Sequence, residues 1–357
     1  MRLVFLTKYS ILGASSRYRS FLYFKYLKDI YDYDICYNSF FNDKYLTRLY
    51  NNEKTKLLSI LFFVFKRIYY VLFKIKQKDI VFIEYEIIPY FPSILEFYLK
   101  IRNIKYVLDY DDAIFHNYDI NNNFIIKKLL KNKIPNISKC ASAIITGSSY
   151  LTNYFRTYNR NIFEIPTSIP FEYYHDILIE KSKGPKTYIG WIGSKSTSVN
   201  LLPYCNLINE IIKIKKDVIF IFCGCDIKLK SIFSSKVIFL DWNYNNEKFF
   251  LSKVDVGIMP LLDNNFNKGK CGFKLVQYMA VGIPTISTPF QSNIDIDNGN
   301  GNLFAKNVKE WEKAFNDIID NYEYYKHIGI KNRKTIKDKY SIESNVFHIH
   351  KIINSIS

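Results

Sequence analysis

The stretch GKCGFKLVQYMAVGIPTISTPF, residues 269–290, runs from a loop through a helix to the start of a buried strand. Gly269 and Gly272 leave the backbone open ahead of the helix. The apolar residues with helical spacing are Val276, Met279, Ala280 and Ile283. Gly282 suits the left-handed conformation that caps a helix, and Pro284 prevents the helix from continuing. The stretch therefore predicts a helix whose apolar stripe lies on a sheet, followed directly by a strand.

The same stretch carries positive charge where a helix does not favour it. We expect Lys270, Lys274 and Gln277 to share one helix face, because they are four and three residues apart. The free N–H groups and the positive dipole end at a helix N-terminus attract anions and disfavour lysine. Two lysines there predict a bound phosphate or pyrophosphate. The alternative is a pair of solvated surface lysines.

Short β-type runs alternate with helical patterns along the whole chain. In the first half the runs are Leu3–Leu6, Ile80–Ile83, Tyr106–Leu108, Ala143–Ile145 and Ile162–Ile165. In the second half they are TYIGWIG, DVIFIFCG, KVIFLDW, DVGIMPL and IPTIST, with helices near 200–215, 246–253, 272–281 and 307–321. Alternating strands and helices are typical of parallel sheets covered on both faces. The pattern predicts an α/β protein of two doubly wound domains facing across a cleft, with ligands beyond the carboxyl ends of the strands.

The boundary between the two halves is predicted from a loss of periodicity. Residues 166–186 contain three prolines and a glycine, which is typical of a linker. We therefore expect one domain over residues 1–168 and a second over 186–339. A final helix over 340–357 is expected to cross back to the first domain.

Charge and cysteine content narrow the class of protein. The net charge is +17, and residues 1–170 carry 25 Lys and Arg against 14 Asp and Glu, which predicts an anionic partner. The six cysteines form no CxxC pair, as expected of reduced thiols in a cytoplasmic protein. No run approaches the roughly 20 apolar residues of a membrane span. The basic, apolar helix that begins near residue 57 either lies on a membrane surface or is buried in a core.

Two polar motifs follow predicted strands of the first half. GASSRYR, residues 13–19, opens a helix and brings two arginines whose charge we expect to face the cleft; a capped helix with solvated arginines is the alternative. LDYDDAIF places Asp109, Asp111 and Asp112 at a strand end, where mutual repulsion should raise at least one pKa. A metal site and a purely structural helix cap are alternatives to substrate contact there.

In the second half, IGWIGSKST follows the first strand. Gly193 allows close approach of the backbone to a ligand, and Ser194 and Thr197 offer hydroxyls and a helix cap. A simple capped turn is the alternative. Trp242 follows a later strand, and core packing is the alternative to a role for it beside a nucleobase.

The stretch GKCGFKLVQYMAVGIPTIST resembles the C-terminal donor-binding motif of GT-B glycosyltransferases, most closely family 4 of the retaining enzymes. Further segments match that family in order: SSRYR, LDYDDAIF, ITGSSYL, IPTSI, IGWIGSKST and DVGIMPL. The resemblance implies the GT-B fold, two Rossmann-like domains with the nucleotide sugar on the C-terminal one. It implies no cofactor and no catalytic metal, because the nucleotide diphosphate sugar is a substrate.

The resemblance also implies roles for individual residues. The donor-binding residues it implies are Gly13, Ser15, Arg17, Gly193, Ser194, Lys195, Thr197, Trp242, Gly272, Phe273 and Gln277. The catalytic residues it implies are Lys270, Lys274 and Asp111. The acceptor-side residues it implies are Arg19, Asp109 and Asp112. Most family members have two glutamates eight positions apart, where this chain has Gly269 and Gln277. Gln277 can still bond to ribose hydroxyls, but without charge, and Gly269 cannot reach the sugar with a side chain.

The function expected from the resemblance is transfer of a sugar from a nucleotide diphosphate to a hydroxyl, with retention at the anomeric carbon. In this mechanism the acceptor attacks from the face of the leaving group. The basic first half suggests a glycan or lipid-linked glycan acceptor at the inner face of a bacterial membrane, in assembly of a capsule, O-antigen or exopolysaccharide. A GT-B sugar-nucleotide epimerase, a basic nucleic-acid-binding protein and an inactive binding relative are the alternatives. No nucleic-acid docking motif is present, so nucleic acid is not expected as a partner.

Overall fold

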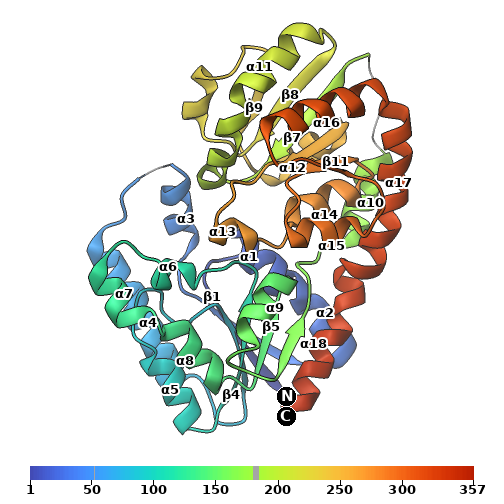
Figure 1. Ribbon diagram of the computed structural model, residues 1–357. Helices are drawn as coiled ribbons and strands as arrows, with labels where there is room; N and C mark the ends of the chain where they lie inside the picture. Colours follow the sequence, from blue (N-terminus) through green and yellow to red (C-terminus); the bar gives the residue numbers. More distant parts are fainter. Residues whose placement is uncertain (52, 180–184) are drawn as a thin grey trace. The chain divides into compact units, whose positions relative to one another are not determined.

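The computed structural model describes residues 1–51, 53–179 and 185–357 (Figure 1). The chain forms two compact units. The first unit consists of Met1–Ser168, Lys268–Cys271 and Ile342–Ser357. The second consists of Ile169–Asn267 and Gly272–Ser341. Each unit contains a parallel six-stranded sheet among its described residues, so the predicted α/β class with two Rossmann-like sheets is confirmed.

The sheet of the first unit has the strand order β2-β1-β3-β4-β5-β6. The strands are β1 Arg2–Thr7, β2 Asp34–Ser39, β3 Ile80–Glu84, β4 Lys105–Tyr110, β5 Ala143–Thr146 and β6 Ile162–Glu164. Strand β1 lies between β2 and β3, with Val4 opposite both Cys36 and Val81. The direction of winding therefore reverses between β1 and β3, and ligands of doubly wound sheets bind at such a reversal.

Helices cover both faces of this sheet. They are α1 Ala14–Ser16, the π-helix η1 Arg17–Phe21, α2 Leu22–Tyr31, α3 Asp43–Tyr50, α4 Leu57–Phe73, α5 Ile94–Ile101, α6 His116–Asp119, α7 Phe124–Leu130, α8 Lys133–Cys140, α9 Ser149–Phe155 and α18 Ile342–Ile356. One face is covered by α2 and α18, and the other by α4, α5, α8 and α9 (Figure 1). Because both faces are buried, strands such as β1 and β3 contain continuous apolar runs without alternation, as expected of parallel strands.

The second unit repeats this plan with the strand order β12-β11-β10-β7-β8-β9. Its strands are β7 Thr187–Ile192, β8 Val218–Cys223, β9 Ile238–Leu240, β10 Val256–Met259, β11 Thr285–Ser287 and β12 Leu303–Phe304. Its helical elements are α10 Phe171–Ile179, the 3-10 helix η2 Lys195–Tyr204, α11 Cys205–Ile214, the 3-10 helix η3 Ile227–Ser231, α12 Tyr244–Lys253, α13 Asn265–Lys268, α14 Phe273–Ala280, α15 Gln291–Asp297, α16 Val308–Asp320 and α17 Tyr322–Lys339. The winding reverses between β7 and β10, so the loops that follow these two strands surround the expected ligand position.

The structure corrects two predictions about local elements. The segment predicted as a linker contains helix α10, in which Tyr174 and Ile177 are fully buried; residues 180–184 of that segment lie outside the described residues. Helix α14 begins at Phe273, so Lys270 precedes it and does not share a helix face with Lys274 and Gln277. Gly272 has a φ of 63° at the N-cap, and this left-handed conformation separates Lys270 from the helix.

Helix α4 is the basic, apolar helix that the sequence predicts, and its apolar side chains are not confined to the buried side. Its inner side buries Phe63, Arg67 and Val71, whereas large apolar side chains lie on the outer side. No helix among the described residues is both long and apolar enough to traverse a bilayer. Arg67 is 1 % exposed, and its Nη2 donates to the backbone oxygens of Thr7 (2.7 Å) and Asn38 (2.9 Å) at the ends of β1 and β2. Burial lowers the pKa of Arg67 to about 9, against the opposing effect of Glu84.

Replacement of Arg67 by alanine should destabilise the protein, because two strand-end carbonyls lose a charged donor and a cavity remains. We expect the free energy of unfolding to fall by about 2–4 kcal/mol. The matched control is Lys66→Ala, which changes an exposed neighbour on the same helix and should alter it by less than about 0.5 kcal/mol. Equal effects of the two substitutions in chemical denaturation would contradict the buried role of Arg67.

Candidate functional site

In the first unit, the candidate residues gather where β1, β3 and β4 end. The innermost group is the ion pair of Arg19 with Asp109, in which Arg19 Nε lies 3.1 Å from Asp109 Oδ2 and Nη1 donates to the backbone oxygen of Ile165 at 2.7 Å. The two side chains are only 4 % and 10 % exposed. Burial lowers the pKa of Arg19, but the adjacent Asp109 reverses this effect and the pKa is raised. The expectation that Arg19 offers free positive charge to a ligand is therefore corrected, because Asp109 neutralises it inside the first unit.

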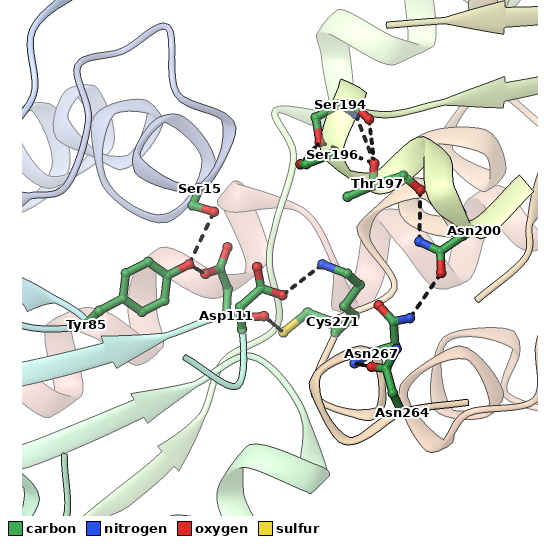
Figure 2. Close-up of polar contacts among 12 residues, drawn as sticks. Ser15, Tyr85, Asp111, Ser194, Ser196, Thr197, Asn200, Asn264, Asn267 and Cys271 are labelled. Carbon is green, nitrogen blue, oxygen red and sulfur yellow. Dashed lines mark hydrogen bonds and ion pairs between the residues drawn. The ribbon is translucent and has the colours of Figure 1, made fainter. Parts of the chain in front are cut away.

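Asp111 and Asp112 lie nearer the surface of the same strand end. The Tyr85 hydroxyl donates a hydrogen bond to Asp111 Oδ1 and lies 3.3 Å from Ser15 Oγ (Figure 2). Asp112 Oδ1 accepts from Lys270 Nζ at 3.2 Å. Burial raises the pKa of both Asp109 and Asp112, and Asp111 adds a smaller repulsion, so burial outweighs the predicted mutual repulsion. Within the described residues, no three His, Cys, Asp or Glu side chains are grouped as a metal ion would require.

Lys270 belongs to a short segment, Lys268–Cys271, that packs on the first unit. The thiol of Cys271 donates to the backbone oxygen of Asp111 at 2.8 Å (Figure 2). A Cβ atom on Gly269 would lie 2.4 Å from the Cβ of Ala113 and 3.1 Å from its backbone nitrogen. No side chain fits at residue 269 without movement of this backbone. The glycine that stands where related enzymes have a glutamate is thus required by close packing.

The arginines and hydroxyls of the GASSRYR motif are held by the π-helix η1 and by its neighbours. Arg17 is buried, and its guanidinium lies 4.8 Å from the Tyr18 ring centroid. Residue 13 has no room for a side chain, because a Cβ atom there would lie 2.4 Å from Tyr9 Cβ. Neither arginine is solvated, so the alternative of a capped helix with solvated arginines is wrong.

Glu84 is a buried carboxylate beside these residues that the sequence did not single out. Its Oε2 accepts from the Lys8 backbone N–H (2.9 Å) and the Ser16 hydroxyl (2.6 Å), which ties the loop after β1 to the end of β3. Its Oε1 is buried without a hydrogen-bond partner. Burial raises the pKa of Glu84 to about 7, against the effect of both hydrogen bonds. The pKa of Lys8 is raised as well, because nearby Tyr9, Glu84, Glu86 and Asp112 outweigh its burial.

In the second unit, Lys274 occupies the first turn of α14. Its Nζ lies 4.4 Å from the ring centroid of Trp191, which is fully buried at the end of β7. An indole face attracts a cation through its electron-rich π-system. Trp191 therefore holds the Lys274 ammonium at the reversal between β7 and β10.

The loop after β7 is ordered by its own hydroxyls. Ser194 and Thr197 form a reciprocal capping box at the start of η2, in which the Ser194 N–H donates to Thr197 Oγ1 at 3.1 Å (Figure 2). Gly193 is required by packing, because its Cβ would lie 2.6 Å from the Trp191 ring and 2.8 Å from Thr197 Oγ1. Lys195 is the first residue of η2. The predicted capped turn is confirmed, and it stands directly beside the residue that positions Lys274.

The loop before α14 is tied to the same 3-10 helix by asparagines. Asn200 Oδ1 accepts from the Leu262 N–H (2.9 Å) and from Asn267 Nδ2 (3.0 Å), and the Asn267 N–H donates to Asn264 Oδ1 at 2.8 Å (Figure 2). These bonds join the segments that follow β7 and β10.

Gln277 is only 4 % exposed, on the inner side of α14. Its Nε2 lies 3.1 Å from the Tyr174 hydroxyl, which lies 3.4 Å from Glu247 Oε1; Glu247 Oε2 accepts from Trp242 Nε1 at 2.8 Å. Trp242 is half-buried, so its side chain is part of a polar chain and not of the apolar core. The structure thus brings the predicted donor-binding residues Gln277 and Trp242 into one network through two residues the sequence did not indicate.

The residues missed by sequence reasoning fall into two groups. Trp191 stands inside a motif that was recognised, and its position at a strand end was a usable signal. Glu84 likewise directly follows a predicted strand. Tyr174 and Glu247 had no such signal, because the segment of Tyr174 was interpreted as a linker and Glu247 is an ordinary first-turn acid.

The raised pKa of Glu84 predicts a specific dependence of stability on pH. Between pH 4.5 and 7 the carboxyl ionises in the unfolded chain but stays protonated in the folded one, so the free energy of unfolding falls as pH rises. Relative to wild type, Glu84→Gln should gain about 3 kcal/mol across this interval and no more above it. The difference between the two proteins in urea unfolding at each pH measures the effect. A control, Glu312→Gln at an exposed position of α16, should show no such trend.

Residues 186–321 match the family described as glycosyl transferases group 1. No curated protein sequence matches the chain significantly. The Anabaena protein HepE in complex with UDP-glucose has a similar structure, with a TM-score of 0.72 and 13% identity over 99% of this chain and 100% of that one. A glycosyltransferase from Rickettsia africae has a TM-score of 0.68 and 13% identity, covering 99% and 98% of the two chains.

TarM of S. aureus, in complex with fondaparinux, alpha-GlcNAc-glycerol and UDP, is also similar. Its TM-score is 0.60 with 17% identity, over 81% of this chain and 58% of TarM. At such identities these structures define the fold. The chain has the fold of GT-B glycosyltransferases, and its residues 186–321 match the family model of the glycosyl transferases group 1.

Proposed function

We propose that the protein transfers a sugar from a nucleotide diphosphate donor, with UDP as the first nucleotide to test, to a hydroxyl acceptor with retention of anomeric configuration. The observation that carries the proposal is the Lys274 ammonium held over Trp191 at the N-terminus of α14, inside the segment that matches group 1 glycosyltransferases. A cation held in position at the N-terminus of a helix suits a diphosphate. HepE and TarM, which share the fold, are bound to UDP or UDP-glucose.

In the proposed reaction, the bond between the anomeric carbon and the diphosphate oxygen breaks, and the electron pair remains on the diphosphate. Lys274 and the first N–H groups of α14 stabilise this developing negative charge. The acceptor oxygen bonds to the same face of the anomeric carbon, and its proton passes to the departing phosphate oxygen. Neither a metal nor a further cofactor takes part in this proposal.

The first unit supplies a second set of residues for the proposal. Asp111, oriented by Tyr85, is the proposed polar contact to the sugar or acceptor. Lys270, paired with Asp112, is proposed to add positive charge near the diphosphate. Arg19 and Asp109 are proposed only to hold the strand end in place, because they satisfy each other in the interior.

The substitution Lys274→Ala should lower turnover by about 100-fold or more, since loss of one stabiliser of developing charge has effects of that size. The measurement is single-turnover sugar transfer from UDP-, GDP- and CDP-sugars, after a thermal-shift screen identifies the nucleotide that binds. Lys309→Ala, an exposed lysine on α16, is the control and should retain wild-type turnover. Near wild-type transfer by Lys274→Ala would remove that lysine from the mechanism. Conversion of the donor without any acceptor would instead favour an epimerase.

We further propose that the acceptor is glycan linked to lipid, used at the inner face of the cytoplasmic membrane in assembly of surface polysaccharide. The support is the outer side of α4, whose large exposed side chains are Leu57, Leu58, Leu61, Phe62, Phe65, Tyr69 and Phe73. Leu58 and Phe65 are 77 % and 67 % exposed. Exposed lysines lie on and beside the helix: Lys54, Lys56, Lys66, Lys74, Lys76 and Lys78. Apolar side chains flanked by lysines suit an anionic bilayer surface. Arg67, a basic residue of the same helix, is buried and takes no part.

Replacement of Leu58, Phe62 and Phe65 by serine should lower binding to vesicles containing anionic phosphatidylglycerol by more than about 10-fold, because each buried side chain contributes roughly 1.5–3 kcal/mol. Vesicle flotation measures the effect. The control replaces three exposed apolar residues of the second unit, Ile214, Ile227 and Tyr324, by serine. Unchanged flotation of the α4 variant, or no flotation of wild type, would contradict the proposal.

A further inference from the structure

Consecutive hydrogen bonds link Trp242, Glu247, Tyr174 and Gln277, and the chemistry of these groups fixes which of them donates in each bond. An ionised carboxylate only accepts hydrogen bonds, and an indole N–H only donates. Trp242 donates to one oxygen of Glu247 at 2.8 Å, so the Tyr174 hydroxyl, 3.4 Å from the other oxygen, is the donor of the second contact. Exposure is 2 % for Glu247 and zero for Tyr174, so water competes little for these contacts.

The direction of that contact fixes the orientation of the Gln277 amide. The Tyr174 hydroxyl has one hydrogen, and Glu247 receives it. Its oxygen must then accept from Gln277, 3.1 Å away, and only the Nε2 end of the amide can donate. The carbonyl Oε1 of Gln277 is left as the acceptor end. A side chain that could present either a donor or an acceptor therefore presents an acceptor.

Three separate elements of the second unit hold this chain together. Tyr174 lies on α10 and Gln277 lies on α14. Glu247 lies in the first turn of α12, and Trp242 lies in the loop that leads from β9 to that helix. Gln277 stands one turn after Lys274, so it lies beside the proposed diphosphate position. A diphosphate of a nucleoside carries a ribose next to it, and a ribose presents hydroxyl donors.

We propose that Glu247, acting through Tyr174, is a positioning residue that orients Gln277 as an acceptor for the ribose hydroxyls of the donor nucleotide. This inference rests on the proposed function and extends it. A carboxylate can accept a hydrogen bond from a hydroxyl through either of its oxygens. In this proposal the uncharged amide of Gln277 also accepts from a hydroxyl, because its orientation is fixed. Glu247 and Tyr174 do not touch the ligand in this proposal, and their effect is confined to the ribose contact.

The test compares UDP with 2′,3′-dideoxy-UDP, which lacks the ribose hydroxyls, by isothermal titration calorimetry. Tyr174→Phe removes the hydroxyl that fixes the amide, and Glu247→Gln keeps the size of the side chain but lets it donate. Each variant should bind UDP about 3- to 10-fold more weakly than wild type, the size expected for one hydrogen bond. Binding of dideoxy-UDP should be unchanged, so the preference for UDP is lost. The control is Tyr173→Phe, a neighbouring tyrosine of the same helix, which should keep that preference.

The ratio of the two affinities within each variant separates positioning from a loss of overall stability. Equal weakening of both ligands in the two variants would show a merely structural role and overturn the inference. An unchanged preference for UDP in both variants would overturn it as well. If wild type binds neither UDP nor any other nucleoside diphosphate, the proposed function falls and the inference falls with it.

Discussion

Both candidate sites depend on one constraint, which is that the carboxyl ends of parallel strands lie at the same edge of the sheet. All strands of such a sheet end at one edge, and where the winding reverses, two neighbouring loops turn apart and leave the edge open. In the first unit the reversal lies between β1 and β3, near Ser15 and Tyr85; in the second it lies between β7 and β10, near Trp191 and Lys274. Residues far apart in sequence converge for this reason alone, and the loops determine what chemistry they offer.

Charge at a buried sheet edge has a desolvation cost, and the first unit offsets it at nearly every carboxylate. Asp109 is paired with Arg19, Asp112 with Lys270, and Asp111 accepts from Tyr85. Glu84 has two hydrogen bonds on one oxygen and none on the other, and protonation is what remains to relieve the burial of its charge. The second unit adds an aromatic contact: the Lys274 ammonium lies over the Trp191 ring, which attracts a cation.

The two positions at which the chain departs from the family pattern have physical explanations. Gly269 has no room for a side chain because Ala113 lies against it. Gln277 lacks the charge of a glutamate, and the buried carboxylate of Glu247 lies two contacts away, linked through Tyr174. An acidic residue is thus present in the second unit, but on a neighbouring helix. A substitution that weakens a site when viewed alone can be compensated by the tertiary surroundings.

The sequence by itself determined the α/β class, most of the strands, the boxed turn at Ser194 and the family resemblance. These depend on local information: apolar runs, helical periodicity and turn-forming residues are read within a few positions. Strand β2, which is half polar, and the two-residue strand β12 lacked that signal, and the helix of residues 171–179 was hidden by the prolines on either side of it and by its mixed pattern. Only the tertiary structure decided that Arg67 is internal, that Arg19 is neutralised, and that Lys270 stands outside α14. The partners of these residues lie tens to more than a hundred positions away, and Tyr174 and Gln277 are 103 residues apart, so local pattern carries no record of their contact.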